Sequence, residues 1–224
     1  MLFGEAVMIN WSDVAVEHRH AYYEWHSREH MVGRVAIPGF RRGRRYIAAR
    51  ASRDFLVCYE VENIGVPTSE AYMMKANAPS PLTQRTTPFV KNASRGLARV
   101  RASFGIGMGG AALTLRFDPD GARAESLEAW LTTEALPALS NIAEITGAHF
   151  MIADREASAV VPVERQGRPT TVPNRIVLVE GVSVAALEEL CEAYLNDAAL
   201  RRNGAGADIV RDTYTLQITV SAEP

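Results

Sequence analysis

One succession of strand and helix patterns occurs twice along this chain, and the repetition limits the folds that the chain can adopt. Period-2 and helical spacings of apolar residues, together with turn and capping residues, mark the elements. The first half is predicted to contain strands over 6–11, 41–50, 55–61 and 97–104, a helix over 14–35, a helix capped by Thr68 or Ser69 and ending near Asn77, and a short helical piece over 82–86. The second half is predicted to contain strands over 112–117, 148–154, 175–180 and 213–220 and helices over 123–140 and 184–195. Each half therefore has the order β-α-β-β-α-β.

The two halves can be aligned without a gap through their opening stretch. Identical residues recur there at a spacing of 105 positions. These pairs are Trp25 and Trp130, Glu29 and Glu134, Ile37 and Ile142, and Ile47 and Ile152. The identity in this window is low, but the repeated order of elements makes internal duplication the better interpretation.

A β-α-β-β-α-β unit is the ferredoxin-like fold, in which helices cover one face of a four-stranded antiparallel sheet. The other face of such a sheet also needs cover. We therefore predict an α+β fold of two ferredoxin-like units, residues 1–104 and 111–224, which pack together or close into one barrel within the chain. The glycine-rich segment 105–110 would link the two units.

This linker also matches GxGxxG through Gly105, Gly107 and Gly110. A dinucleotide site needs a helix directly after the motif, because the phosphates bind helical N–H groups. Residues 112–117 instead alternate as a strand. We therefore predict a linker and no cofactor.

The charge and composition exclude several classes of partner. The net charge of −2 gives no field that would collect nucleic acid, so small neutral or mildly anionic ligands remain open. No apolar run is long enough to cross a bilayer, and the first residues lack the pattern of a secretory signal. A cytoplasmic protein without a membrane partner is expected. Cys58 and Cys191 each lie in an apolar segment and are predicted to be reduced, buried thiols.

The first helix carries the richest set of proton-transfer groups. His26, Glu29 and His30 lie on one side of a helix of 3.6 residues per turn. The apolar stripe of the second-half helix, transposed by 105 positions, passes through His26 and borders Glu29. These side chains are therefore expected to face inward. They would form either a structural polar cluster or a site in which an imidazole acts near neutral pH.

His26 to His30 also fits HxxEH, the inverted zinc-protease motif. That site needs a further carboxylate ligand on a long helix, whereas a Pro-Gly turn follows here at Pro38-Gly39. We predict no metal, with an unspecified metal site as the alternative.

Alternation along the next strand places Arg44 and Tyr46 on one face, shared with His149 of the second half. The arginine run around Arg44 is typical of a solvated rim, but one guanidinium could bind an acidic substrate group. Tyr59 is a further candidate, with a core or interface tyrosine as the alternative. The predicted substrate-binding residues are therefore His26, Arg44, Tyr46 and Tyr59.

Two stretches carry a resemblance to a known family. They are Trp25-His26-Ser27-Arg28-Glu29-His30-Met31 and Ile37-Pro38-Gly39-Phe40, which leads into the strand through Arg45-Tyr46. They resemble the EthD-like branch of the dimeric α+β barrel superfamily over about the first hundred residues. The resemblance implies a small-molecule cavity between helices and sheet. It also implies that His30 is an acid/base catalyst paired with Glu29. In the second half Ala135 replaces His30 and Leu131 replaces His26, so any site would be single.

The leading hypothesis is a cofactor-independent enzyme for a small hydrophobic carbonyl or aromatic compound, with His30 as acid/base and Glu29 orienting it. Isomerase, cyclase or lyase chemistry suits these residues because each begins with proton transfer. The alternatives are a binding protein of the same fold without turnover and a cofactor-free monooxygenase. Assembly into a homodimer is left open.

Overall fold

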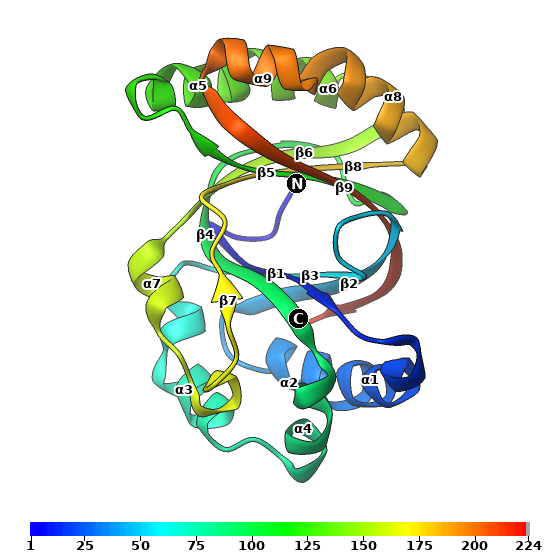
Figure 1. Ribbon diagram of the computed structural model, residues 1–224, viewed down its shortest axis with the longest axis vertical. Helices are drawn as coiled ribbons and strands as arrows, with labels where there is room; N and C mark the ends of the chain where they lie inside the picture. The colour runs from blue at the N-terminus through cyan, green and yellow to red at the C-terminus, as the bar shows by residue number, and fades with distance from the viewer. Residues whose placement is uncertain (223–224) are drawn as a thin grey trace.

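The computed structural model describes residues 1–222, and its strands form one closed antiparallel barrel (Figure 1). The ring runs β1-β3-β2-β9-β5-β8-β6-β4, and β4 pairs with β1 to close it. Its strands are β1 (Ala6–Asp13), β2 (Phe40–Arg50), β3 (Phe55–Val61), β4 (Lys91–Gly105), β5 (Ala111–Pro119), β6 (Ile145–Ala153), β8 (Arg175–Gly181) and β9 (Ala205–Ser221). The α+β class and the barrel predicted from the sequence are confirmed.

Helices cover the barrel on two opposite sides, one set from each half of the chain (Figure 1). The first set is η1 (Val16–His18), α1 (Arg19–Trp25), η2 (His26–His30), α2 (Met31–Val35), η3 (Val66–Thr68), α3 (Glu70–Asn77), α4 (Pro81–Thr86) and η4 (Thr87–Phe89). The second set is η5 (Gly121–Arg123), α5 (Ala124–Trp130), η6 (Leu131–Ala135), α6 (Leu136–Ser140), α8 (Val184–Leu195) and α9 (Asp197–Asn203). Of the helices in residues 1–222, none has the length and apolar character needed to span a membrane.

The barrel interior is filled by side chains from alternate strand positions. Leu56, Cys58 and Tyr46 are buried there, and Met151 and Tyr214 pack against them from the second half. Cys58 and Cys191 are both free and buried, as predicted. The outer faces of the two sheet halves pack against their own helices. The molecule is therefore layered as helices, barrel and helices.

The opening elements of the two halves have matching bounds. β1 and β5, α1 and α5, η2 and η6, α2 and α6, and β2 and β6 each begin 105 residues apart. Both η2 and η6 are single π-helical turns inside an otherwise α-helical segment. The predicted 14–35 and 123–140 helices therefore exist, but each contains a π turn that the sequence pattern did not predict.

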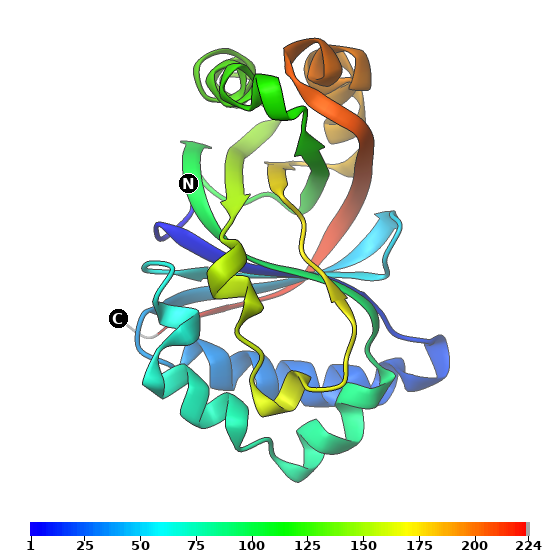
Figure 2. The same ribbon diagram turned by 60° about the vertical axis from the view of Figure 1, so that its left-hand side comes forward.

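The spacing changes after β2 and β6. β3 begins at Phe55 and β8 at Arg175, which is 120 residues apart, so the second half has 15 more residues from the start of β6 to the start of β8 than the first half has from β2 to β3. They belong to residues 154–174, which we call the strap. The strap contains α7 (Arg155–Ala159), η7 (Val163–Arg165) and β7 (Thr170–Thr171). Figure 2 shows it crossing to the first half, where β7 pairs in parallel with β4.

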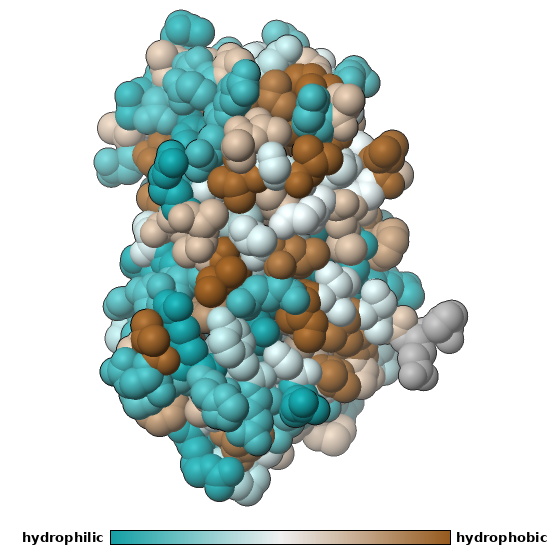
Figure 3. Space-filling view, turned by 90° about the vertical axis from the view of Figure 1, so that its right-hand side faces the viewer, coloured by the Kyte–Doolittle hydropathy of each residue, from teal (hydrophilic) through white to brown (hydrophobic). Residues whose placement is uncertain are grey.

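The segment 106–110 joins β4 to β5, and a strand follows the glycine motif as the sequence indicated. The two halves are hydrogen-bonded into the same barrel through the β2–β9 and β4–β6 pairs. Exposed apolar side chains such as Val16, Met74 and Ile106 lie on separate elements. Figure 3 shows several separate groups of apolar residues among polar ones on one face. Homodimer formation stays a prediction.

Candidate functional site

A narrow cavity of about 80 Å³ lies between the outer face of the first-half sheet and its helices. The sheet contributes Met8, Asn10, Ser12, Val57, Tyr59 and Arg95. The helical layer contributes Tyr22, Trp25, His26, His30, Arg34 and Tyr72, followed by Thr87 and Val90. The strap contributes Glu164, Arg165 and Arg168 and so covers the cavity from the second half of the chain.

The π turn η2 presents both histidines of the first helix to this cavity. The His26 and His30 ring centroids are 5.6 Å apart, and the His30 ring lies 4.4 Å from that of Trp25. Single π turns within α-helices are frequent at functional sites. The prediction that His26 and His30 face inward is confirmed.

His26 is buried, and the partner of one ring nitrogen fixes its tautomer. Arg45 Nη1 lies 3.2 Å from His26 Nδ1, and a guanidinium can only donate, so Nδ1 accepts. The proton of the neutral ring is therefore on Nε2. Burial, followed by the charge of Arg45, holds the pKa of His26 well below its ordinary value. At neutral pH His26 is a neutral hydrogen-bond donor through Nε2–H.

His30 is partly buried and differs from His26 in its hydrogen bonding. Within residues 1–222, no hydrogen bond reaches either ring nitrogen of His30. Burial, then the charge of Arg34 and the nearby His26, hold its pKa well below the ordinary value. His30 also borders a surface cleft that it shares with Arg34 and Lys75. It is therefore a neutral base between the cavity and solvent.

Tyr59 contributes a buried phenol to the same cavity. Its Oη has no hydrogen-bond partner among the described residues, although the side chain is only 3% exposed. Burial raises the pKa of Tyr59, so the phenol stays protonated at neutral pH. An unpaired buried donor costs free energy, which a ligand that accepts a hydrogen bond would recover. Tyr59 therefore lines the cavity as predicted.

Glu29 does not orient His30, contrary to the sequence hypothesis. Its carboxylate accepts hydrogen bonds from Ser80 Oγ at 2.5 Å and Thr83 Oγ1 at 3.0 Å. Thr83 also accepts a hydrogen bond from Trp25 Nε1 at 2.9 Å. Glu29 thus fastens the first helix to α4 and lines the outer cleft rather than the cavity.

Arg44 and Tyr46 are also absent from the cavity lining. They share the inner face of the barrel with His149, as alternation predicted, but that face is a filled interior. Arg44 Nη1 donates to Tyr46 Oη at 2.8 Å and to Glu180, and Arg44 Nη2 lies 2.9 Å from Glu60 Oε1. His149 Nε2 is 3.3 Å from Glu180 Oε2. These groups compensate one another inside the barrel.

Sequence reasoning missed Asn10, Arg34, Arg95 and the strap residues of the cavity. Arg34 lies on α2 and forms an ion pair with Glu164 of the strap. No periodic pattern marks the strap, since it forms only two short helices and a two-residue strand. Strand alternation could have identified Asn10 and Arg95, because each lies on the same face of its strand as buried apolar residues, Met8 for Asn10 and Leu97 for Arg95.

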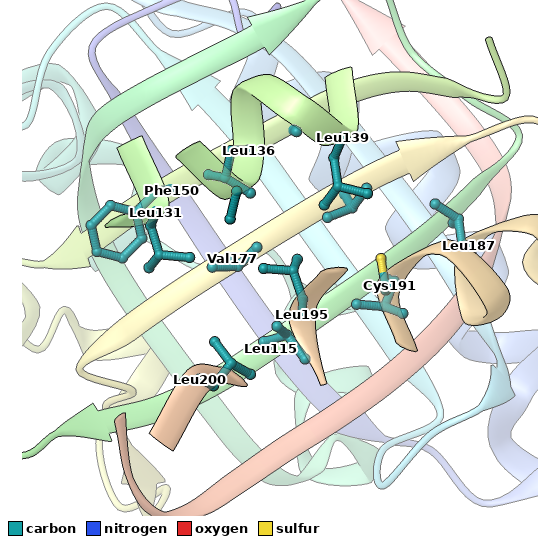
Figure 4. Packing of buried hydrophobic residues seen from close by; sticks show 14 of the residues in the cluster. Leu115, Leu131, Leu136, Leu139, Phe150, Val177, Leu187, Cys191, Leu195 and Leu200 are labelled. Carbon is teal, nitrogen blue, oxygen red and sulfur yellow. The ribbon is translucent and has the colours of Figure 1, made fainter. Parts of the chain in front are cut away.

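The corresponding region of the second half has no polar lining. Transposed by 105 positions, the cavity residues Asn10, Tyr22, His26, His30 and Arg34 become Leu115, Leu127, Leu131, Ala135 and Leu139, all buried in one hydrophobic cluster. Figure 4 shows Leu131 and Leu136 packed from the helix toward Val177 on β8, with Leu115 nearby. Apolar packing therefore occupies the place of the cavity.

The metal alternative requires a third ligand beside the two imidazoles. Among residues 1–222, no three His, Cys, Asp or Glu side chains gather in a way that could hold a metal ion. The Glu29 carboxylate, which the HxxEH pattern would place near the metal, is instead bonded to Ser80 and Thr83.

The fold resembles several solved structures at low sequence identity. An anthrone oxidase-like protein aligns over 98% of this chain and 93% of its own, with 12% identity and a TM-score of 0.62. A candidate monooxygenase from Lactobacillus acidophilus aligns over 97% of both chains, with 8% identity and a TM-score of 0.61. A mutant chlorite dismutase from Candidatus Nitrospira defluvii aligns over 94% of this chain and 90% of its own, with 9% identity and a TM-score of 0.53.

No protein-family model matches the chain, and no curated protein matches it by sequence. The likenesses to solved structures extend over almost the whole chain, so they concern the complete barrel and not one half of it. At these identities they establish the fold alone. The chain therefore has the α+β barrel fold of these proteins.

Proposed function

We propose that the protein is an enzyme that transfers a proton within a small carbonyl or aromatic compound, with His30 as the base. The observation that carries this proposal is the neutral imidazole of His30, which has no hydrogen-bond partner among residues 1–222 and faces the cavity beside two donors, His26 Nε2–H and Tyr59 Oη–H. A general base and hydrogen-bond donors to the developing oxyanion are the two groups that enolate formation requires.

In the proposed reaction, His30 removes a proton from the carbon next to a carbonyl group. The electrons of the C–H bond move to the carbonyl oxygen, which becomes an enolate. His26 Nε2–H and Tyr59 Oη–H donate hydrogen bonds to that oxygen, and nearby Arg34 stabilises its negative charge. Protonated His30 then returns the proton to the same or another carbon, which gives exchange or isomerisation.

A second candidate is a cofactor-free monooxygenase. It is favoured by two proteins of similar fold, an anthrone oxidase-like protein and a candidate monooxygenase. Proton abstraction by His30 would be its first step as well, and molecular oxygen would then react with the carbanion. A third candidate is a protein that binds the same ligand without turnover, in which His26 and Tyr59 only orient it.

The ancestry of the site also belongs to this proposal. We infer that the chain is a duplicated ferredoxin-like unit of the EthD-like branch, in which the first copy has the site and the second is a scaffold. The matching element bounds at a spacing of 105 residues support duplication, as do the two strand orders β4-β1-β3-β2 and β9-β5-β8-β6. A small hydrophobic ligand and a cytoplasmic location stay predictions.

Proton exchange from deuterated solvent tests the proposal most directly. A panel of enolisable ketones and anthrone is incubated with the protein in D2O, and NMR follows loss of the C–H signal while an electrode follows oxygen. We expect exchange with wild type, loss of about 100-fold or more with His30→Ala, and no change with His20→Ala, an exposed histidine of α1.

The outcomes separate the three candidates. Exchange without oxygen consumption supports proton transfer alone, whereas both together support the monooxygenase. Ligand binding without exchange, equal in wild type and His30→Ala, would leave the binding protein as the function.

A further inference from the structure

The cavity has an excess of positive charge that the proposed chemistry does not by itself require. Four guanidinium groups line it, from Arg34, Arg95, Arg165 and Arg168, together with a single carboxylate, Glu164. That carboxylate is paired with Arg34. The other three arginines therefore have no carboxylate partner within the lining.

Arg95 is the clearest case. It projects from β4 toward the helices, and the residue is only 5% exposed. Among the described residues, the hydrogen-bond acceptor of its guanidinium is the thioether of Met8, with Nη2 at 3.0 Å from Sδ. Thioether sulfur is a weak acceptor, so this contact cannot compensate a buried charge. A buried charge without a partner costs several kcal/mol in order of magnitude, which makes it an unusual feature for stability alone.

The strap arginines add to the same field. Arg165 Nη2 donates to Thr170 Oγ1 at 2.8 Å, and Arg168 Nη1 donates to the Glu164 backbone oxygen at 3.3 Å. Both partners are neutral. Burial, then the charges of Arg95 and Arg168, lower the pKa of Arg165 to about 9, so Arg165 is still charged at pH 7 and is repelled by the neighbouring guanidiniums.

We propose that Arg95 and Arg165, assisted by Arg168, bind a carboxylate group, so the ligand of this cavity is a small organic acid. A guanidinium binds a carboxylate through two parallel hydrogen bonds, and removal from water strengthens the pair. The cavity wall also includes the aromatic rings of Tyr22, Trp25 and Tyr72, which favours an unsaturated or aromatic body for this acid. Turnover of the bound acid rests on the proposed function, whereas binding of the acid is independent of it.

Binding of benzoate and acetate, two carboxylates of different size, tests this inference, with benzamide as the neutral counterpart of benzoate. Titration calorimetry and ligand NMR compare wild type with Arg95→Met and Arg165→Met. Arg101→Met is the matched control, because Arg101 lies on the same strand with its side chain 57% exposed. We expect benzoate or acetate to bind wild type and the control, and to bind each cavity variant at least about tenfold more weakly. Benzamide should bind wild type no better than it binds the variants.

Thermal unfolding without ligand provides an independent readout. If Arg95 is kept for a ligand, Arg95→Met relieves repulsion and should unfold at the same or a higher temperature than wild type. A structural arginine would give a lower unfolding temperature.

Three results would overturn the inference: no binding of either carboxylate to wild type at millimolar concentration, equal binding to wild type and Arg95→Met, or equal binding of benzoate and benzamide. The failure of the proposed function looks different. His30→Ala should still bind the carboxylate, so binding without exchange would refute only the enzyme. If the protein exchanges the protons of neutral ketones and carboxylates do not inhibit this exchange, only the organic-acid ligand would be refuted.

Discussion

Replacing Arg44 by Met should destabilise the protein by about 3–5 kcal/mol at pH 7. Arg44 is completely buried in the barrel, where it contacts Glu60, Glu180 and Tyr46. Removal of the Arg44 guanidinium leaves the buried carboxylates of Glu60 and Glu180 with less positive charge to compensate them. Burial by itself would raise the pKa of Glu180, but Arg44 and then His149 lower it to about 2 from an ordinary 4.5. That lowering alone corresponds to about 3 kcal/mol of stability.

The pH dependence gives the sign of the effect. In wild type the folded pKa of Glu180 lies below its unfolded pKa, so its contribution is complete above pH 4.5 and is lost as the pH falls from 4.5 toward 2. In Arg44→Met, burial dominates and the folded pKa rises above the unfolded one. Protonation then favours the folded variant. The stability difference between wild type and Arg44→Met should therefore shrink as the pH falls from 7 to 5.

Urea unfolding followed by tryptophan fluorescence measures the loss of stability at pH 7 and its change between pH 7 and pH 5, since Trp11 is buried in the barrel interior. Arg101→Met serves as the exposed control and should stay within about 0.5 kcal/mol of wild type. The double variant Arg44→Met/Glu180→Leu should be more stable than Arg44→Met, because both members of the pair become apolar. A loss below about 1 kcal/mol for Arg44→Met, or a difference that widens from pH 7 to pH 5, would refute the reasoning.

Three further expectations follow from the contrast between the two halves and from the turn at the end of β4. Because the pKa of His30 is lowered, its neutral form persists below pH 6.5; kcat/KM should stay constant as the pH falls from 8 through 6.5, and a decline centred above 6.5 would exclude His30 as the base. Leu131→His should lower the unfolding free energy by about 1–3 kcal/mol, because it buries an imidazole among leucines. The converse variant His26→Leu should keep the unfolding free energy within about 1 kcal/mol of wild type and lose exchange activity. Equal thermal stability of wild type and Leu131→His would contradict this expectation. Gly105→Ala should cost about 1–3 kcal/mol in urea unfolding, since Gly105 has a φ of 105° and an added Cβ would lie 2.3 Å from the Thr146 carbonyl oxygen; unchanged stability would show that the turn relaxes.

The fold was predictable because its elements are locally encoded. Ser69, one of the two predicted capping residues, accepts a hydrogen bond from a backbone N–H group at the start of α3, and Ser183 does the same at the start of α8. The π turns were not predictable, since each is a single, rare turn within an otherwise α-helical segment. β7 could not be predicted either, because a two-residue strand exists only through its contact with β4.

The site was predictable where a polar residue of the first half stands at a position that is apolar and buried in the second half. His26 stands where the second half has Leu131, and that position is buried in both halves. The error on Arg44 has a different origin. Alternation gave the correct face, but whether that face is a cavity or a filled interior depends on Glu180, a partner 136 positions away in the chain. Likewise, Glu29 finds its partners in Ser80 and Thr83, in a proline-broken stretch without periodicity.

The strap explains why a symmetric scaffold would have one site. In the first half, β2 and β3 are joined by residues 51–54, which are too short to reach beyond their own hairpin. In the second half, residues 154–174 separate β6 from β8 and extend over the first-half sheet. The strap is held there by the Arg34–Glu164 ion pair and by the Asn77 side chain, which accepts a hydrogen bond from the Val163 N–H at 3.0 Å.

No equivalent segment can reach the second-half sheet, because its counterpart in the first half is the short turn 51–54. The second half must therefore cover its own outer sheet face, and it does so with the leucines of α5, η6 and α6. The first half receives part of its cover from the strap, which leaves room for polar groups beneath it. Polar lining and strap depend on each other: without the strap His30 and Arg95 would be more hydrated, and the lowered pKa of His30 would rise toward its ordinary value. The asymmetry of the proposed site thus follows from one insertion of 15 residues.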